Sequence, residues 1–368
     1  MDPETAALTA EERTLLKLRA LYRKYGYAQY RMSKFEEYDL YAGNKDFLVS
    51  ENVLTFTDLN GKLMALKPDV TLSIVRGSPD RTDSVRKVFY NENVYRTAGS
   101  TRTFREIPQT GLECIGPIDD YCILEVLLLA AESLKCISDR SVLEISQLDI
   151  LSALTEGLGV PEETRRRLLK CIGAKNLHEL RAVCREAGAP PEKAEPLEKL
   201  AAAGGRPEEV LPLLRALPCP PEAVRQLEAL TEGFRAAGLE EMLRMDFSVV
   251  NDMQYYNGIV FRGFVYGVPV SVLSGGQYDR LMRKMGRSAG AIGFAVYLDE
   301  LERITPEDAS FDADVLLVYG EGVSPTRVCR EARALAAVGK TVMAQPREPQ
   351  GMRFGGVRRL TGKEDRDA

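Results

Sequence analysis

An expected strand at Phe104–Ile115 carries an amide, a glycine and a carboxylate at every second position. Side chains along an extended strand alternate between two faces, so Gln109, Gly111 and Glu113 share one face and apolar residues fill the other. The glycine leaves room above the sheet, where the two polar side chains offer hydrogen bonds to a small polar ligand. A solvated sheet face explains the same pattern, and the strand by itself favours that explanation.

A tyrosine pair and a glycine pair form a second candidate site. Tyr255 and Tyr256 offer a stacking surface and phenolic hydroxyls to a ring-bearing ligand, and Gly275–Gly276 allow close approach of the backbone. A buried tyrosine pair followed by a plain turn fits equally well. The glycine pair also lacks the spacing of the common phosphate-binding loops.

Charged residues beside expected strand ends give a third candidate. The segment KPDVT supplies acceptors at Asp69 and Thr71 that suit an ammonium group, and Arg96 ends the strand VFYNENVYR. A guanidinium there suits an anion such as a phosphate or a carboxylate. The alternative is that these groups are solvated charges at strand ends.

The single histidine among 368 residues limits the chemistry. Most metal centres and most Ser–His or Cys–His catalytic arrangements need imidazole, and His178 lies in a charged helical stretch without a partner motif. The sequence therefore predicts no metal site and no cofactor.

Charge and cysteine content point to an ordinary cytoplasmic protein. The chain has 49 Lys and Arg against 54 Asp and Glu, which excludes a generally basic nucleic-acid binder. Its seven cysteines form no CxxC pair, as expected of free thiols in a reducing compartment. The acidic amino terminus lacks the apolar stretch of a signal peptide. The longest apolar run, Ile123–Ala131, is shorter than the ~20 residues of a membrane span.

The elements that must position these residues indicate an α+β fold. Thr9 and Glu12 form a capping box for a first helix that Gly26 ends. Strand patterns follow from Tyr27 to Gly116, and a leucine-rich helix is expected at Ile118–Lys135. Short helices broken by prolines occupy residues 155–240, after which strand patterns return. A β–α–β fragment and a charged tail end the chain.

Four of these segments occur in an order that resembles the catalytic core of class II histidyl-tRNA synthetases. They are KPDVT, VYR…FREIPQTGLECIG, NDMQYYNGIVF and GGQYD…AIGFAVYLDEL, and the similarity spans roughly Leu8 to Ile304. The resemblance implies a class II antiparallel sheet flanked by helices. It also implies a histidine site, in which the amino group lies against Asp69, Thr71 and Gln109 and the imidazole against Glu113 and Tyr256.

The chain departs from the synthetases at residues that handle ATP. Asn251 stands where they carry an arginine before the tyrosine pair, and Glu300 replaces the motif 3 arginine. At an effective ε of about 20, two unit charges a few ångströms apart differ by several kcal/mol between attraction and repulsion, so ATP activation is not expected. The loop after Arg96 lacks the acidic residue of motif 2, and Ser33 replaces the motif 1 proline.

The carboxyl-terminal segment is also short for a synthetase. Ala313–Ala368 supplies about half of an anticodon-binding domain, so tRNA binding is not expected. The resemblance therefore implies four segments. They are a first core part at 1–153, a helical insertion at 154–241, a second core part at 242–308, and a truncated anticodon-binding-like fragment with its tail at 309–368.

A chain that keeps the histidine acceptors but lacks these arginines resembles the ATP phosphoribosyltransferase regulatory subunits. The resemblance implies a non-catalytic chain that activates a short catalytic partner in the first step of histidine biosynthesis and transmits feedback inhibition by histidine. It further implies a homodimer within a hetero-octamer, and a site formed by Asp69, Thr71, Arg96, Gln109, Glu113, Tyr255 and Tyr256. Histidine binding at the interface with the catalytic chain stays open. The alternatives are a divergent histidyl-tRNA synthetase and a stand-alone histidine-binding module.

Overall fold

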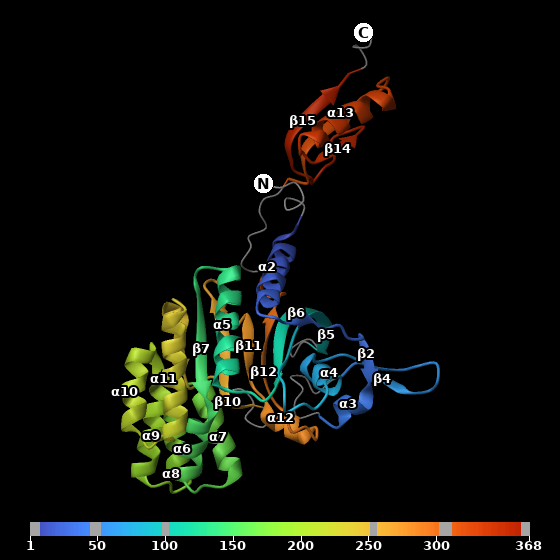
Figure 1. Ribbon diagram of the computed structural model, residues 1–368. Helices are drawn as coiled ribbons and strands as arrows, with labels where there is room; N and C mark the ends of the chain where they lie inside the picture. Colours follow the sequence, from blue (N-terminus) through green and yellow to red (C-terminus); the bar gives the residue numbers. More distant parts are fainter. Residues whose placement is uncertain (1–7, 45–52, 98–102, 251–255, 302–310, 362–368) are drawn as a thin grey trace. The chain divides into compact units, whose positions relative to one another are not determined.

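A computed structural model describes residues 8–44, 53–97, 103–250, 256–301 and 311–361. The chain divides into a larger unit, Glu11–Ile304, and a smaller unit formed by Met1–Ala10 and Thr305–Ala368. Both units are shown in Figure 1.

A nine-stranded, mostly antiparallel sheet organises the described part of the larger unit. Only the β1–β5 and β7–β9 pairs are parallel among its described ladders. In spatial order the strands are β1 (Ala28–Gln29), β5 (Arg86–Thr97), β6 (Phe104–Gly116), β12 (Gly290–Tyr297), β11 (Leu273–Gln277), β10 (Asn257–Val265), β7 (Ser141–Gln147), β9 (Leu243–Asp246) and β8 (Gly204–Gly205). The predicted class of fold is confirmed.

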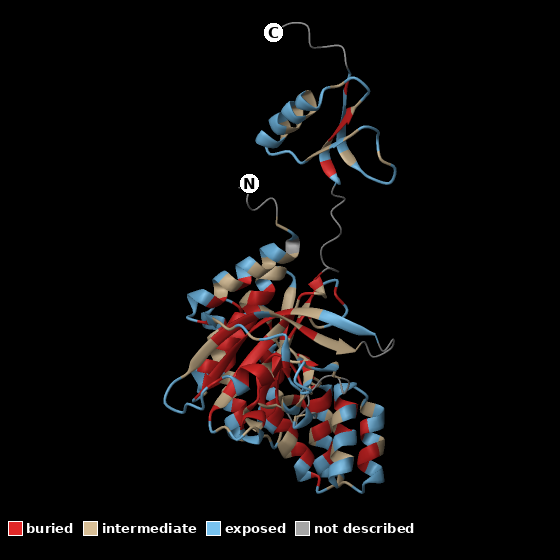
Figure 2. Ribbon diagram, turned by 90° about the vertical axis from the view of Figure 1, so that its right-hand side faces the viewer, coloured by how far each residue is buried: buried red, intermediate tan, exposed pale blue. Residues whose placement is uncertain are grey.

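One face of this sheet packs against two helices, α2 (Ala10–Lys24) and α5 (Asp120–Ile137). The Asp119 side chain caps α5 by accepting from the backbone N–H of Cys122 at 2.8 Å. Phe89, Leu112 and Phe294 enter the apolar core on this face. Buried residues concentrate around the sheet in Figure 2. The leucine-rich helix and its packing against the sheet are thus as predicted.

The opposite face is covered by shorter elements. These are α3 (Tyr38–Ala42), α4 (Thr71–Arg76), α12 (Asp279–Lys284) and a small sheet of β2 (Phe35–Glu37), β4 (Leu63–Leu66) and β3 (Thr55–Thr57). The prediction of strands and loops alone between Tyr27 and Gly116 is therefore wrong at α3 and α4. Both helices are five or six residues long and form by packing into the second apolar cluster, which local patterning does not reveal.

Six helices form a group beside the sheet: α6 (Leu148–Gly157), α7 (Glu162–Gly173), α8 (Leu177–Glu186), α9 (Pro191–Ala202), α10 (Pro207–Ala216) and α11 (Pro221–Ala236). Prolines begin three of them, where the missing N–H costs no hydrogen bond. A 3₁₀ turn at Glu240–Met242 leads back to the sheet. One apolar cluster runs from these helices into the sheet, so the segment boundaries at 153 and 241 stay a prediction.

The smaller unit contains a three-stranded parallel sheet in the order β14 (Val342–Gln345), β13 (Ala313–Tyr319) and β15 (Phe354–Leu360), with α13 (Pro325–Ala337) packed against it. The prediction of a charged tail after the β–α–β fragment is wrong at β15, which pairs with β13 from Phe354 to Leu360. The two glycines and two arginines of β15 give it no alternating apolar pattern, so the sequence does not predict a strand there. The strand forms because β13 offers a free edge.

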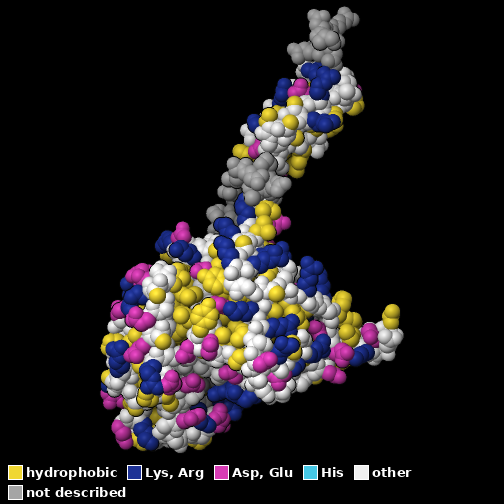
Figure 3. All heavy atoms as spheres, in the orientation of Figure 1, with side chains coloured by type: hydrophobic (Ala, Val, Ile, Leu, Met, Phe, Trp, Pro, Cys, Tyr) yellow, Lys and Arg dark blue, Asp and Glu magenta, His cyan; other side chains and the backbone are white. Residues whose placement is uncertain are grey.

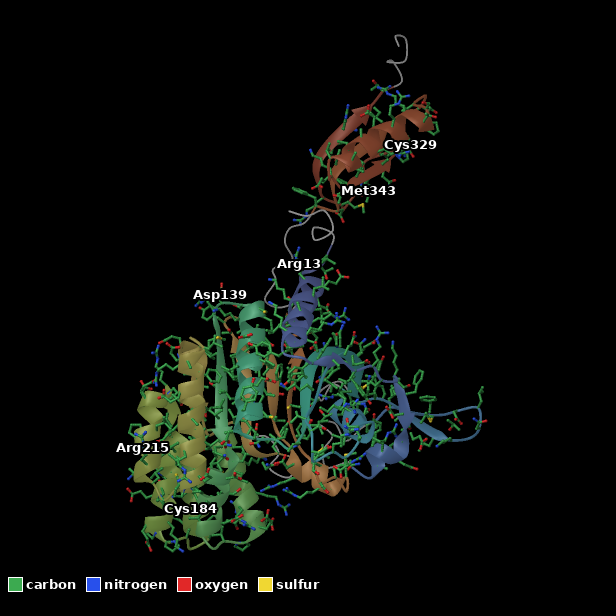
Figure 4. The ribbon with its side chains drawn as sticks, viewed as in Figure 1. Arg13, Asp139, Cys184, Arg215, Cys329 and Met343 are labelled. Carbon is green, nitrogen blue, oxygen red and sulfur yellow. The ribbon has the colours of Figure 1, made fainter. Side chains whose placement is uncertain are left out.

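The cysteines and surface charges agree with the sequence predictions. All seven cysteines are free; Cys184 on α8 is buried and Cys329 on α13 is exposed (Figure 4). On the face shown in Figure 3, basic and acidic side chains intermingle over the larger unit. Among the described residues, no helix has the length and apolar character needed to cross a membrane, and no group of side chains is arranged to hold a metal ion.

Candidate functional site

Polar side chains are buried at the centre of the sheet face that α4 and α12 cover. Gln109 is 3% exposed and Glu113 is 2% exposed, so the alternative of a solvated face is wrong. The Nε2 atom of Gln109 has no hydrogen-bond partner among the residues that the structure describes. A buried amide nitrogen without a partner costs free energy, which marks this face as a place for a ligand or for bound water.

Glu113 is held by side chains from two covering segments. Thr71 Oγ1 donates to Oε1 at 2.9 Å, and Tyr278 Oη donates to Oε2 at 2.5 Å. The carboxyl group lies over Gly293 of β12, where a Cβ atom would collide with it. Burial raises the pKa of Glu113 to about 8, partly opposed by the two hydroxyl donors and increased by the charge of Asp69. The site therefore holds this carboxyl protonated near neutral pH.

Asp69 and Arg96 form the rim of the same cluster. Asp69 Oδ1 accepts from the backbone N–H of Leu72 at 2.9 Å, at the start of α4. Burial raises the pKa of Asp69, and Arg96 lowers it. Arg96 Nε donates to the Pro68 carbonyl at 2.8 Å, and its Nη2 lies 3.9 Å from Asp69 Oδ2. Arg96 therefore ties the Asp69 segment to β5 instead of being a solvated strand end, and its role toward a ligand stays a prediction.

The ring of Tyr256 packs over Gly276 of β11. A Cβ atom on Gly276 would lie 2.7 Å from Tyr256 Cδ1, so a larger residue would displace the ring. Burial raises the pKa of Tyr256, and the nearby charges of Tyr297, Glu113 and Asp69 raise it further. Tyr256 thus lies in the electrostatic neighbourhood of the two carboxyl groups. Tyr255 and Asn251 lie outside the described residues.

Sequence reasoning assigned no role to three tyrosines of the cluster. Tyr90 pairs with Gly111 across the β5–β6 ladder, and a Cβ on Gly111 would lie 2.6 Å from Tyr90 Oη. The space predicted above Gly111 is therefore occupied by the phenol of Tyr90. Tyr297 Oη lies 2.6 Å from Ser274 Oγ. Tyr278 lies two residues after the glycine pair Gly275–Gly276, so the sequence around that pair could have identified it as a site residue. The positions of Tyr90 and Tyr297 follow only from strand register.

The assembled groups suit binding of a small ligand. Two carboxyl groups, a threonine hydroxyl and several phenols offer acceptors for an ammonium group and for ring N–H groups. Glu300, in the position where the resemblance predicts an ATP-binding arginine, is half-buried just after β12. A carboxylate there repels a triphosphate, so the arrangement favours binding without nucleotide chemistry.

The pKa of Glu113 predicts a pH dependence of stability. An unfolded glutamate, with an ordinary value of 4.5, is ionised at pH 6, whereas the folded carboxyl keeps its proton up to about pH 8. The folded state binds more protons across this window, so stability falls as pH rises, by about 3 kcal/mol between pH 6 and pH 9. Denaturant unfolding of wild type and Glu113→Gln at both pH values measures the difference between their free energies of unfolding. If that difference is the same at both pH values, the raised pKa of Glu113 is contradicted.

Comparisons with known proteins identify the family of the chain. The family model for histidyl-tRNA synthetase matches residues 1–301. The ATP phosphoribosyltransferase regulatory subunit of Clostridium kluyveri is 30% identical over 322 residues, which are 83% of this chain and 81% of the relative.

Two solved structures have a similar fold. One is an ATP phosphoribosyltransferase regulatory subunit/histidyl-tRNA synthetase from Bacillus halodurans, with a TM-score of 0.76 at 22% identity over 95% of this chain and 93% of the other. The other is the ATP phosphoribosyl transferase (HisG:HisZ) complex from Thermotoga maritima, with a TM-score of 0.62 at 19% identity over 79% of this chain and 98% of the other. At these identities the likeness concerns the fold. From the family model and the regulatory-subunit relative together, the chain belongs to the ATP phosphoribosyltransferase regulatory subunits, non-catalytic proteins built on the histidyl-tRNA synthetase fold.

Proposed function

We propose that this chain binds histidine and transmits feedback inhibition to a short catalytic phosphoribosyltransferase chain, which it also activates. The reaction served is the condensation of ATP with phosphoribosyl pyrophosphate. The observation that carries the proposal is the buried Glu113 carboxyl, held by Thr71 and Tyr278 beside Asp69. The solved HisG:HisZ complex with a similar fold supports a catalytic chain as the partner.

The proposed ligand position follows the chemistry of the cluster. The ammonium group of histidine lies against Asp69, Thr71 and the Gln109 carbonyl oxygen, and an imidazole N–H donates to Glu113. Tyr256 packs against the ring. Burial raises the pKa of Glu113 and of Asp69, which disfavours their charged forms, and a cationic ligand offsets this effect by pairing with them. Arg96 and Tyr255 belong to the same proposed site.

Feedback requires that histidine bind two states of the assembly with different affinities. A ligand that binds both states equally shifts neither, and effectors of this kind typically couple by about 1–3 kcal/mol. We propose a cytoplasmic homodimer of this chain within a hetero-oligomer, with an octamer as the expected stoichiometry. Binding of tRNA is not part of this proposal.

Co-expression with a short catalytic chain tests the proposal. The two chains are expected to elute together from a size-exclusion column, and the complex to be more active than the catalytic chain alone and inhibited by histidine. Absence of both co-elution and activation would favour a stand-alone histidine-binding module. Histidine-dependent exchange of pyrophosphate into ATP by this chain alone would instead support a divergent synthetase.

A further inference from the structure

A pocket of about 630 Å³ opens at the carboxyl end of β6. Its walls come from the β6–α5 connection, from α12 and from the loop that precedes β12. The described residues that line it are Thr82, Gly116, Pro117, Ile118, Asp279, Arg283, Arg287, Ser288, Ala289 and Gly290. The volume falls in the range of about 300–1,000 Å³ typical of small-molecule sites.

The charge offered to this pocket is positive. Of the described residues that line it, Asp279 is the acidic one, and both of its oxygens already accept hydrogen bonds. Ala291 N–H donates to Oδ1 at 2.9 Å, and Asn257 Nδ2 donates to Oδ2 at 3.0 Å. These neutral donors orient the carboxylate without removing its charge, but Arg283 and Arg287 outnumber it, so the described lining carries a net positive charge.

The arginine-bearing loop is held in place before any ligand arrives. Arg287 Nη2 donates to the Val75 and Arg76 carbonyls at 3.5 and 3.3 Å, which uses one edge of a guanidinium that carries five donors. Asp80 accepts from the backbone N–H groups of Ser288 and Ala289 at 3.0 and 3.1 Å. Such a wall loses little conformational freedom on binding, which favours affinity.

We propose that this pocket binds a small molecule bearing a pyrophosphate group, through Arg283 and Arg287. Guanidinium groups match the geometry of phosphate oxygens and bind them by paired, charge-assisted hydrogen bonds. Two guanidiniums around one cavity suit two linked phosphates better than a single carboxylate. The hydroxyls of Thr82 and Ser288, which also line the pocket, supply further donors.

This site is separate from the proposed histidine site. Tyr278 donates to Glu113 in the buried cluster, and the next residue, Asp279, lines the pocket. The two sites thus share the start of α12 but no ligand-contacting residue. Loss of histidine binding and loss of pyrophosphate binding are therefore distinguishable experimentally.

Calorimetric titration of the full chain with inorganic pyrophosphate tests the proposal. Wild type is expected to bind, and Arg283→Gln to bind about tenfold more weakly or worse. Lys284→Gln is the matched control, because it removes the same charge from the same helix at a residue that does not line the pocket. Circular dichroism checks that each variant is folded.

Three results would overturn the proposal. The first is no binding by the wild-type chain, and the second is an equal loss for Arg283→Gln and Lys284→Gln, which indicates general charge attraction. The third is equal binding of citrate, a polyanion without phosphate. A difference between the two variants together with preference for pyrophosphate supports it.

Discussion

Glu113→Gln is expected to weaken histidine binding about 100-fold while leaving the chain folded. Burial keeps the proton on Glu113 in the free protein, and a ligand N–H that donates to the carboxyl favours its ionised form. Hydrogen bonds to charged groups contribute about 1.5–3 kcal/mol, and the amide of glutamine cannot ionise to make one. The substitution preserves size, and the carbonyl oxygen of the amide still accepts one of the two bonds from Thr71 and Tyr278. The substitution therefore lowers the affinity for histidine rather than the stability of the fold.

Calorimetry with histidine measures this effect, with Glu144→Gln as the control. Glu144 is also a partly buried glutamate on the same sheet, but it lies on β7 beside Arg262 of β10, away from the cluster. Equal heats for wild type and Glu113→Gln would exclude the proposed pocket. In the complex, Glu113→Gln is expected to retain activation of the catalytic chain and to lose inhibition by histidine. Inhibition that persists without binding to the isolated chain would place the effector at the interface between the chains.

Glu92→Gln is expected to destabilise the larger unit by about 3–5 kcal/mol. The Lys67 side chain is 0% exposed, and its Nζ lies 2.8 Å from Glu92 Oε2. Removing the carboxylate leaves a buried ammonium group without its counter-charge, which is much more costly than losing an exposed ion pair. Lys67 also anchors the backbone, since Tyr95 N–H donates to its carbonyl at 2.9 Å. Damage here displaces the neighbouring Asp69 segment and should weaken histidine binding as well.

Denaturant unfolding of three variants tests the role of this pair. Glu37→Gln removes one partner of the exposed Lys62–Glu37 pair and is expected to leave stability unchanged. Lys67→Met combined with Glu92→Gln removes the stranded charge and is expected to recover most of the loss. Equal unfolding midpoints for Glu92→Gln and Glu37→Gln would mean that water reaches the Lys67 ammonium group.

Local patterns predicted the long elements well and the short ones poorly. The capping residues and the leucine-rich face of α5 are encoded within one stretch of chain, so its helix follows from spacing alone. The helices α3 and α4 and the strand β15 were missed because they depend on partners distant in sequence. An isolated helix of five or six residues is unstable in water, so its existence is a property of the packed fold.

The candidate site also depends partly on local sequence pattern and partly on contacts between distant segments. Alternation along β6 placed Gln109 and Glu113 on one face, but the solvated and the ligand-binding explanations differ only in what covers that face. Burial by α4 and α12 decided between them. The Tyr278–Glu113 bond joins residues 165 positions apart, and no spacing in the sequence predicts it.

The sequence by itself determined the family, the class of fold and the loss of the ATP-binding arginines, because residue types in a fixed order carry that information. It also identified Asp69, Thr71, Gln109, Glu113 and Tyr256 as candidate ligand residues. The tertiary structure alone decided that Gln109 and Glu113 are buried beside the partly exposed Asp69, that Arg96 is turned toward Asp69, and that Tyr90 covers Gly111. These facts arise from strand register and from the packing of distant segments, and burial is what converts ordinary polar side chains into a site with a raised pKa.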